Sequence, residues 1–191
     1  MNKIVPAAMA GLFAANAMSA PVTYILDSTH TFPSFEADHM GGRSVWRGKF
    51  NETKGRVIYD KEAKSGSIEV TVAMPSVDFG LKKMNEEARS PLIFNVKKYP
   101  TAVYTGKFTK FHGDAPTEAQ GTLTMHGVTK PVTLTIVTFL CQPDPIVKKQ
   151  VCGADAYASF NRKDFGVDFG EAYGFNMAVK LQIQVEGSPA G

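Results

Sequence analysis

Four histidines are the side chains of this sequence best suited to acid/base or metal chemistry: His30, His39, His112 and His126. Each lies in or beside a stretch with the pattern of a β-strand. With the carboxylates nearby, His30 and His39 are the natural candidates for a metal site or a proton-transferring pair. Positions nine residues apart face opposite sides of one continuous strand, however, and Pro33 makes the path between them irregular. The spacing therefore favours structural or pocket-lining histidines over a catalytic pair.

The short motifs of the common catalytic and cofactor-binding classes are absent from the sequence. It has no GxSxG nucleophile elbow, no GxxxxGK[ST] phosphate loop, no GxGxxG after a strand, no HExxH and no CxxC. Lys and Arg number 21 against 18 Asp and Glu, so the net charge of +3 is too small and too scattered for a dedicated nucleic-acid binder. We therefore expect no cofactor and no nucleic-acid partner.

Basic residues recur along the chain, several of them as adjacent pairs such as Lys82-Lys83, Lys148-Lys149 and Arg162-Lys163. Such pairs usually lie on solvated strand faces and loops. Arg89 differs because it sits between a helical segment and Ser90-Pro91. At that position a guanidinium can meet backbone carbonyls, a ligand head group or a carboxylate, and the sequence leaves these three alternatives open.

The beginning of the chain has the pattern of an export signal. Lys3 is followed by an apolar run over residues 4–15, which is shorter than the roughly 20 residues that a membrane-spanning helix needs. Small residues at the −3 and −1 positions fit cleavage after Ala17 or after Ser19, and we favour Ser19. The alternative, an N-terminal helix of the domain, is less favoured because nothing caps it and no charged face accompanies it. We predict a signal peptide over residues 1–19, a mature domain over 20–191, and a soluble periplasmic protein that does not span the membrane.

Export makes the two cysteines interpretable. Cys141 and Cys152 enclose ten residues that include Pro143 and Pro145, which favours a tight loop between extended flanks. In an oxidising compartment we expect a disulfide between them, which stabilises by about 3 kcal/mol on a chain-entropy estimate. The spacing does not fit a CxxC redox site. Two cysteines without a nearby histidine also make a poor zinc site, so no metal site is predicted.

Past residue 20 the sequence predicts one all-β domain, because it has no linker, no repeat and a periodicity of two. The clearest alternation is in residues 67–74, where even positions are apolar, and in 175–186, where odd positions are. Each is predicted to be a strand with one buried and one solvated face. Weaker alternation predicts further strands at 23–27, 32–39, 45–50, 55–60, 101–110, 120–126, 130–139 and 153–160.

One stretch, residues 76–100, departs from the alternation. Leu81, Met84 and Ala88 have helical spacing there, and Ser90-Pro91 fits an N-cap followed by a first-turn proline, so two short helices are predicted. About eight to ten strands separated by turn residues favour an antiparallel barrel, with a two-sheet sandwich as the alternative. An eight-stranded barrel can be filled by side chains or can hold one small ligand, and periodicity does not distinguish these outcomes.

Several short stretches form an ordered set that is specific although no single one is diagnostic. They are 24–30 (YILDSTH), 39–41 (HMG), 46–50 (WRGKF), 89–91 (RSP), 94–96 (FNV), 98–101 (KYPT), 121–132 (GTLTMHGVTKPV) and 161–166 (NRKDFG). Together they cover nearly all of residues 22–186, and HGVTKPV is the strongest element. With this set the sequence resembles the YceI-like family of exported, lipocalin-like barrels that bind polyisoprenoid or other long-chain lipids.

The resemblance implies a lipocalin-like antiparallel β-barrel of about eight or more strands, with one or two short helices between its central strands. It also implies a binding protein that holds a long-chain isoprenoid or other amphiphilic lipid in an apolar cavity, for transport, storage or stress protection. The residues expected to line that cavity, from the apolar strand faces and from family position, are Phe35, Phe50, Val70, Val72, Phe94, Leu123, Leu134, Phe165, Met177 and Val179. Weaker candidates for contact with a polar head group are His39, Arg89 and His126.

Two other functions stay open at this point. The barrel is an enzyme if His39 or His126 acts on a bound lipid, and the distinguishing feature is a cavity histidine hydrogen-bonded to a carboxylate. It is a structural or partner-binding protein if its core is solid, which the absence of an internal cavity would indicate. Protein partners, including a second copy of the chain in a homodimer, are left open.

Overall fold

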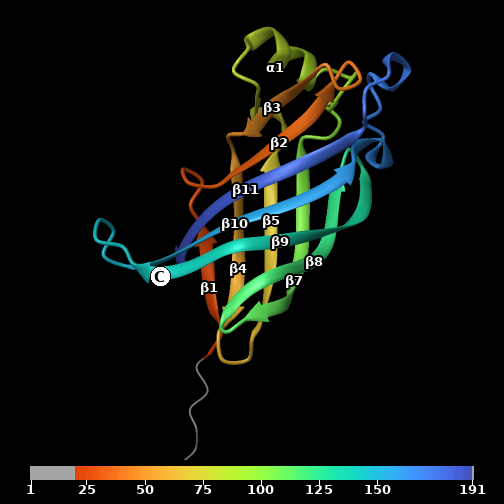
Figure 1. Cartoon of the computed structure of the whole chain (residues 1–191). Coiled ribbons are helices and arrows are strands. Elements are labelled where there is room, and N and C mark those ends of the chain that lie inside the picture. The colour runs from red at the N-terminus through yellow and green to blue at the C-terminus, as the bar shows by residue number, and fades with distance from the viewer. Residues whose placement is uncertain (1–19, 191) are drawn as a thin grey trace, which may run out of the picture.

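Residues 20–190, which the computed structural model describes, form an antiparallel sheet of eleven strands with one α-helix (Figure 1). The strands are β1 (Val22–Leu26), β2 (Phe32–His39), β3 (Ser44–Phe50), β4 (Thr53–Asp60), β5 (Ser65–Ala73), β6 (Val77–Asp78), β7 (Thr101–His112), β8 (Ala115–Met125), β9 (Val128–Pro143), β10 (Gln150–Asn161) and β11 (Ala178–Pro189). The helix is α1 (Lys82–Arg89), and short 3-10 turns occur at η1 (Met74–Ser76), η2 (Arg162–Phe165) and η3 (Glu171–Tyr173). The predicted signal peptide lies outside the described residues.

Eight of the strands close into a ring, because β1 pairs with both β4 and β11. The ring runs β1-β4-β5-β7-β8-β9-β10-β11, and its neighbouring strands are antiparallel. The prediction of an all-β barrel is therefore confirmed, and the sandwich alternative is wrong. Each of the ten strands predicted from alternation is present. The eleventh, β6, has two residues and is too short to show a period.

Different strands form one side of the barrel wall at its two ends. β2 and β3 form a hairpin that continues the β1–β4 ladder beyond a break at residues 27–31. At that break the Asp27 carboxylate accepts hydrogen bonds from the Thr29 backbone N–H at 2.8 Å and from His30 Nδ1 at 2.7 Å. Beyond the break β3 pairs with β6, which follows β5 through η1. The wall at this end is thus made of β2, β3 and β6 in place of β1 and β4.

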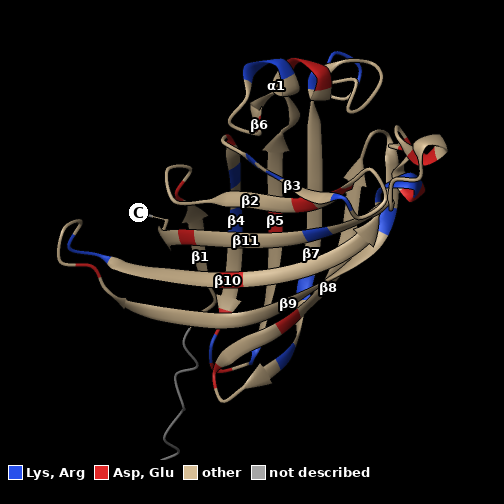
Figure 2. Ribbon diagram, turned by 45° about the horizontal axis from the view of Figure 1, so that its top comes forward, with Lys and Arg blue, Asp and Glu red and all other residues tan. Residues whose placement is uncertain are grey.

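The connections alternate between the two ends of the barrel. The end that is uppermost in Figure 1 carries the turn after β2, the segment with α1, the turn after β8 and the segment 162–177 after β10. The opposite end carries the hairpin turns after β4, β7 and β9. Charged residues of both signs are spread over strands and turns rather than gathered on one face (Figure 2). The two ends therefore differ in their loops and not in the sign of their charge.

Only the first of the two predicted helices forms. α1 ends at Arg89, and the prediction of a second helix beginning at Ser90-Pro91 is wrong. The N–H of Phe94 donates back to Ala88 O at 3.0 Å, and Asn95 takes a left-handed φ of 46°. The chain therefore folds back onto the end of α1 instead of winding into a new helix. Within residues 20–190 no helix has the length and apolarity to cross a bilayer.

Small residues on the inner face of β10 leave the interior incompletely filled. Ala154 and Ala156 face Val185 and Ile183 of β11 across the sheet, and all four side chains line the interior. An eight-stranded barrel has just enough room for large side chains to meet at its axis. Alanines on one strand therefore leave space along that axis.

A β-bulge in β9 alters which of its residues face inward. The register between β9 and β10 shifts at Asp155/Ala156, which leaves Val137 without a partner and 54% exposed. Leu134 and Ile136 line the interior before the bulge, and Phe139 lines it after the bulge. The extra residue thus brings an aromatic ring into the interior that strict alternation would turn outward.

The predicted disulfide is confirmed. Cys141 and Cys152 are bonded with an S–S distance of 2.00 Å, and they are directly opposite each other in the β9–β10 ladder. The bond therefore closes the base of the hairpin turn at 144–149, next to the lower end of the interior.

Replacing both cysteines by serine should lower the free energy of unfolding by about 2–3 kcal/mol, near the chain-entropy value for so short a loop. The strand ladder should survive, because its backbone hydrogen bonds do not depend on the sulfurs. Urea unfolding of the oxidised protein, the reduced protein and Cys141→Ser/Cys152→Ser measures the difference, and the reduced protein is the control with unchanged sequence. A double variant as stable as the oxidised protein would contradict this expectation.

Candidate functional site

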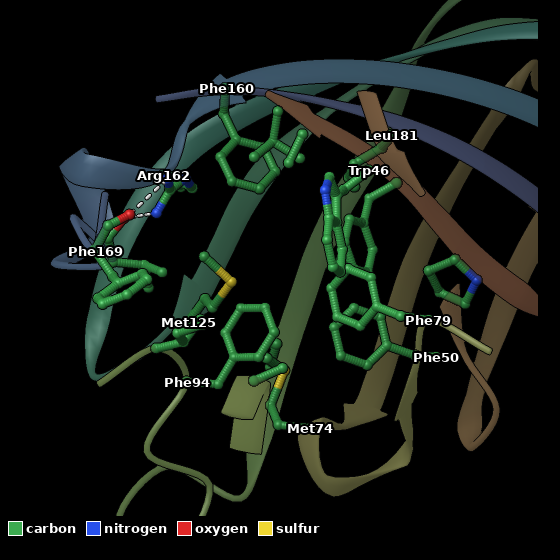
Figure 3. A pocket seen from close by; sticks show the side chains of 18 of the residues that line it. Trp46, Phe50, Met74, Phe79, Phe94, Met125, Phe160, Arg162, Phe169 and Leu181 are labelled. Atoms are coloured by element: carbon green, nitrogen blue, oxygen red, sulfur yellow. Dashed lines mark hydrogen bonds between the residues drawn. The ribbon is translucent and has the colours of Figure 1, made fainter. Parts of the chain in front are cut away.

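An apolar cavity of about 350 Å³ occupies the end of the barrel that carries α1. Aromatic rings in mutual contact form one of its walls (Figure 3). The Phe35 ring lies 5.6 Å from that of Phe50 and 5.3 Å from that of Phe79, centroid to centroid. Trp46 stands edge-on to Phe79 at 5.8 Å, and Phe94 packs on Phe50 at 6.0 Å. We call this space the upper cavity.

A second apolar cavity of about 170 Å³, the lower cavity, lies further down the barrel and is lined mainly by strand residues. Two buried tyrosines, Tyr24 and Tyr59, lie in its wall. The Tyr24 hydroxyl donates to Gln150 Oε1 at 3.1 Å, and the Tyr59 hydroxyl donates to Asp114 O. The Tyr59 ring also packs edge-on against Phe139 at 5.3 Å. These contacts fix both rings in the wall of the lower cavity.

The two cavities meet at a waist of four side chains that line both: Pro33, Val72, Leu123 and Leu181. These side chains come from four different strands, β2, β5, β8 and β11, so the waist encircles the barrel interior. The two spaces thus lie end to end, separated only by aliphatic groups. Together they have the shape required for one long apolar chain.

The polar groups of the upper cavity are confined to its outer end. Asp38 and His39 come from the end of β2, Glu87 from α1 and Arg162 from the start of η2. Glu87 and Phe169 line the cavity and are also exposed to solvent. The upper cavity therefore reaches the surface between α1 and the 162–177 segment, with its charged groups near that opening.

Eight of the ten predicted lining residues lie on the walls of these cavities. Phe35, Phe50, Phe94 and Val179 line the upper cavity, Val70 and Leu134 the lower one, and Val72 and Leu123 both. These eight side chains lie where they would contact a ligand in the cavities. Their role in binding stays a prediction.

The structure corrects the positions expected for Phe165 and Met177. Both are buried, with exposed fractions of 1% and 6%, but neither lines a cavity. Phe165 lies in η2 and packs edge-on against Phe160 at 5.1 Å, and Met177 O accepts the backbone N–H of Arg162. Both precede the regular part of β11, so the alternation of that strand does not determine their direction.

Among the three polar candidates, His39 alone lines a cavity. Its ring lies 5.2 Å from that of Trp46 and 5.5 Å from that of Phe175. Arg89 instead donates from Nε to Pro75 O at 2.6 Å and from Nη2 to Val77 O at 3.1 Å. Arg89 therefore attaches α1 to the η1–β6 segment. Of the three partners that the sequence left open for it, the structure shows backbone carbonyls.

The third polar candidate, His126, is held in the turn after β8. Its Nδ1 lies 3.2 Å from Phe165 O, and its ring packs at a tilt against that of Tyr99, with the centroids 4.3 Å apart. Its φ of 53° is left-handed, in keeping with a tight turn before Gly127. The side chain thus joins this turn to η2 and is placed away from both cavities.

The histidines do not form the arrangement expected of a catalytic site. His30 is exposed and pairs with Asp27, whose carboxylate raises the pKa of His30 while hydrogen bonds from His30 and Thr29 lower the pKa of Asp27 to about 2. That pair lies outside both cavities. His39 Nδ1 contacts Ser44 Oγ at 3.3 Å rather than a carboxylate. Over residues 20–190, no three His, Cys, Asp or Glu side chains are grouped as metal ligands.

Sequence reasoning missed several residues of the upper cavity. Phe79 and Phe169 line it from segments outside the strands, where no periodicity indicates the direction of a side chain. Phe175 lies on the apolar face of the predicted strand 175–186 but was not among the predicted lining residues. Trp46 lies in β3, and only the resemblance singled out its surroundings. Arg162 was grouped with the solvated basic pairs, although its presence in the stretch NRKDFG was a signal that set it apart.

Comparisons with known proteins agree with this architecture. The model of the YceI-like domain family matches residues 24–187. The chain is 32% identical over 177 residues to a UPF0312 protein of Pseudomonas aeruginosa, spanning 91% of this chain and 90% of that protein. It is also 32% identical over 175 residues to protein YceI of Salmonella arizonae, spanning 90% and 88%.

Two solved structures show the same fold. BcnA of Burkholderia cenocepacia superposes with a TM-score of 0.66 at 20% identity, over 84% of this chain and 98% of that one. A polyisoprenoid-binding domain from Saccharophagus degradans superposes with a TM-score of 0.62 at 14% identity, over 88% and 99%. At these identities the likeness concerns the fold.

Replacing Val72 by Phe should close the waist between the two cavities. In a series of prenols of increasing length, the longest should lose more than about tenfold in affinity and the shortest should change little, since each methylene left outside forfeits about 0.8 kcal/mol. Because the ring enters open space, the free energy of unfolding should fall by less than about 1 kcal/mol. Fluorescence titration and thermal melts measure the two effects.

Thr71→Phe is the matched control, because Thr71 is on the outward face of the same strand and should change neither property. A Val72→Phe variant that loses roughly 1–3 kcal/mol of stability without any dependence on chain length would show an overfilled solid core instead.

Proposed function

The chain belongs to the YceI-like family, and from that premise we propose that it is an exported protein that holds a long-chain isoprenoid or another amphiphilic lipid inside its barrel. The observation that carries the proposal is the pair of apolar cavities joined end to end at Val72 and Leu123. The space is open beside α1, and its charged side chains lie only near that opening. This is the arrangement that a molecule with one long apolar tail and one polar head requires.

The energetics favour a tail over an elaborate polar ligand. Burial of hydrocarbon contributes about 0.8 kcal/mol per CH₂, so a tail of a dozen carbons contributes on the order of 10 kcal/mol before the costs of ordering. After those costs, micromolar to nanomolar affinity is within reach without many hydrogen bonds. The cavity walls offer what such a tail needs, since they are built from Phe, Val, Leu, Ile, Met and Ala side chains.

The relatives support the class of ligand. The Saccharophagus degradans domain with the same fold is described as polyisoprenoid-binding. A branched, flexible isoprenoid suits walls made of aromatic rings and Met74, Met84 and Met125, because methionines adapt to irregular shapes. We propose that enclosure shields the lipid from water during transport, storage or protection under stress.

The proposal includes no catalytic step. The cavity histidine, His39, has aromatic rings and a serine hydroxyl as its neighbours, and a proton-transferring pair needs a carboxylate or an equivalent partner. A solid structural core is disfavoured by the two cavities. Binding and release are therefore the activity that the geometry supports best.

Native mass spectrometry of the protein purified from its own host should show a species heavier than the polypeptide. The added mass should disappear after extraction with organic solvent, and the extract should contain an amphiphile with a long hydrocarbon tail. A refolded sample, prepared in the absence of lipid, is the control and should regain the added mass after incubation with the extract. A protein with the polypeptide mass before extraction that also takes up no prenol would contradict the proposal.

Export is part of the same proposal and has a test of its own. The denatured mass of protein from the native host should correspond to a chain that begins at Ala20, and the protein should be released with the periplasmic fraction. This follows from the apolar run and the small residues before Ala20. A mass that includes residues 1–19 would contradict the signal-peptide interpretation and leave the binding proposal untouched.

A further inference from the structure

Arg162 is a guanidinium fixed in place at the wall of the upper cavity. It is the first residue of η2, directly after β10. Its Nη1 donates to Val167 O at 2.9 Å and its Nη2 donates to Phe169 O at 2.8 Å. Both acceptors belong to the segment that follows η2, as the dashed lines in Figure 3 show for the labelled Arg162 and Phe169. The side chain is therefore held rigidly before any ligand arrives.

The third nitrogen of this guanidinium, Nε, is buried and donates to no acceptor among the described residues. Arginine keeps its Nε–H and its charge at all ordinary pH values, so deprotonation does not remove this unpaired N–H group. Buried N–H groups almost always have a partner, and other atoms of the Arg162 side chain line the upper cavity.

The charge of Arg162 is also without a direct counter-ion. Among residues 20–190 no carboxylate forms an ion pair with it, although Asp168, Asp38 and Glu171 act on it from a distance. Glu171 is paired with Lys163 instead. Burial is the largest influence on the Arg162 side chain and lowers its pKa. A half-buried cation of this kind favours an anion close to it.

Asp38 lines the same cavity, but its carboxylate is occupied elsewhere. It accepts the backbone N–H groups of Gly41 at 3.0 Å, Gly42 at 2.6 Å and Asn176 at 2.8 Å. These bonds hold the carboxylate at the junction of the turn after β2 with the 162–177 segment. Asp38 is therefore not placed to accept a hydrogen bond from Arg162.

Resting on the lipid-binding function proposed above, we propose that Arg162 reads the head group of the ligand. An anionic oxygen, of a phosphate or a carboxylate, accepts from the guanidinium and neutralises its charge, while the tail runs past the waist toward the tyrosines. The protein then prefers an anionic amphiphile to a neutral one with the same tail. A neutral hydroxyl or carbonyl oxygen satisfies the hydrogen bond and leaves the charge unpaired.

A purely structural role gives a different expectation. If Arg162 serves only to hold the carbonyls of Val167 and Phe169, the affinity for anionic and neutral ligands with one tail is equal. Substitution of Arg162 then weakens both by the same factor. The ratio of the two affinities therefore separates recognition from support.

Farnesyl phosphate and farnesol are the probes, because they share one tail and differ only in the head. The wild-type protein should bind farnesyl phosphate at least about tenfold more tightly than farnesol. Arg162→Gln should reduce that ratio to about one, because the affinity for farnesyl phosphate falls. The affinity for farnesol should stay within about threefold of wild type. Lys163→Gln is the matched control, because Lys163 is the neighbouring cation, is exposed and lines neither cavity. Its ratio should equal that of wild type.

A spectroscopic reading needs no variant. In wild-type protein, farnesyl phosphate should shift the buried Arg Nε–H resonance strongly downfield, and farnesol should not. Equal wild-type affinities for the two probes, a ratio that persists in Arg162→Gln, or an unmoved resonance overturns the head-group inference while farnesol binding still supports the lipid carrier. Failure of the wild type to bind either probe contradicts the proposed function itself. A Gln variant that does not fold leaves the wild-type ratio and the resonance to decide.

Discussion

Closure of the sheet is the constraint on which the rest of the structure depends. Tyr24–Leu26 of β1 pair with Gly187–Pro189 of β11, and that short ladder turns an open sheet into a ring. A closed ring has a fixed internal width, so the size of the inward side chains decides whether it is solid or hollow. Ala154 and Ala156 of β10 have side chains too short to reach the barrel axis, so space remains beside them. The cavities therefore follow from hydrogen bonding and residue volume together.

The two ends of the closed interior differ in the side chains that line them. Strand hydrogen bonds satisfy the backbone, so the walls can be apolar throughout. The hydroxyls of Tyr24 and Tyr59 bond to neighbouring elements while their rings line the lower cavity. Charged side chains line the interior only at the end that carries α1, from β2, α1 and η2. An amphiphile in such a space has one favourable orientation, with its head beside Arg162.

The strands and the lining that they contribute could be predicted from the sequence, whereas the ends of the barrel could not. Period-two alternation correctly placed Val70, Val72 and Leu123, since a strand with one solvated face must turn the other inward. Helical spacing placed α1, but no comparable rule governs segments 90–100 and 162–177, whose direction depends on specific hydrogen bonds. Fastening of Arg89 to Pro75 O is one such bond, and the clamp made by Arg162 is another. The end of the barrel that carries α1 and the 162–177 segment is thus the part that sequence periodicity predicts least well.

The central claim is that a hydrocarbon tail occupies the barrel interior, and Trp46 offers the most direct test. It is the only tryptophan of the chain and it lines the upper cavity. Titration with a long-chain fatty acid brominated at mid-chain should quench the Trp46 fluorescence in a saturable way, because bromine quenches on contact, and the unbrominated acid should compete without quenching. Fluorescence that stays unchanged through the titration, or that both acids reduce equally, would contradict the account.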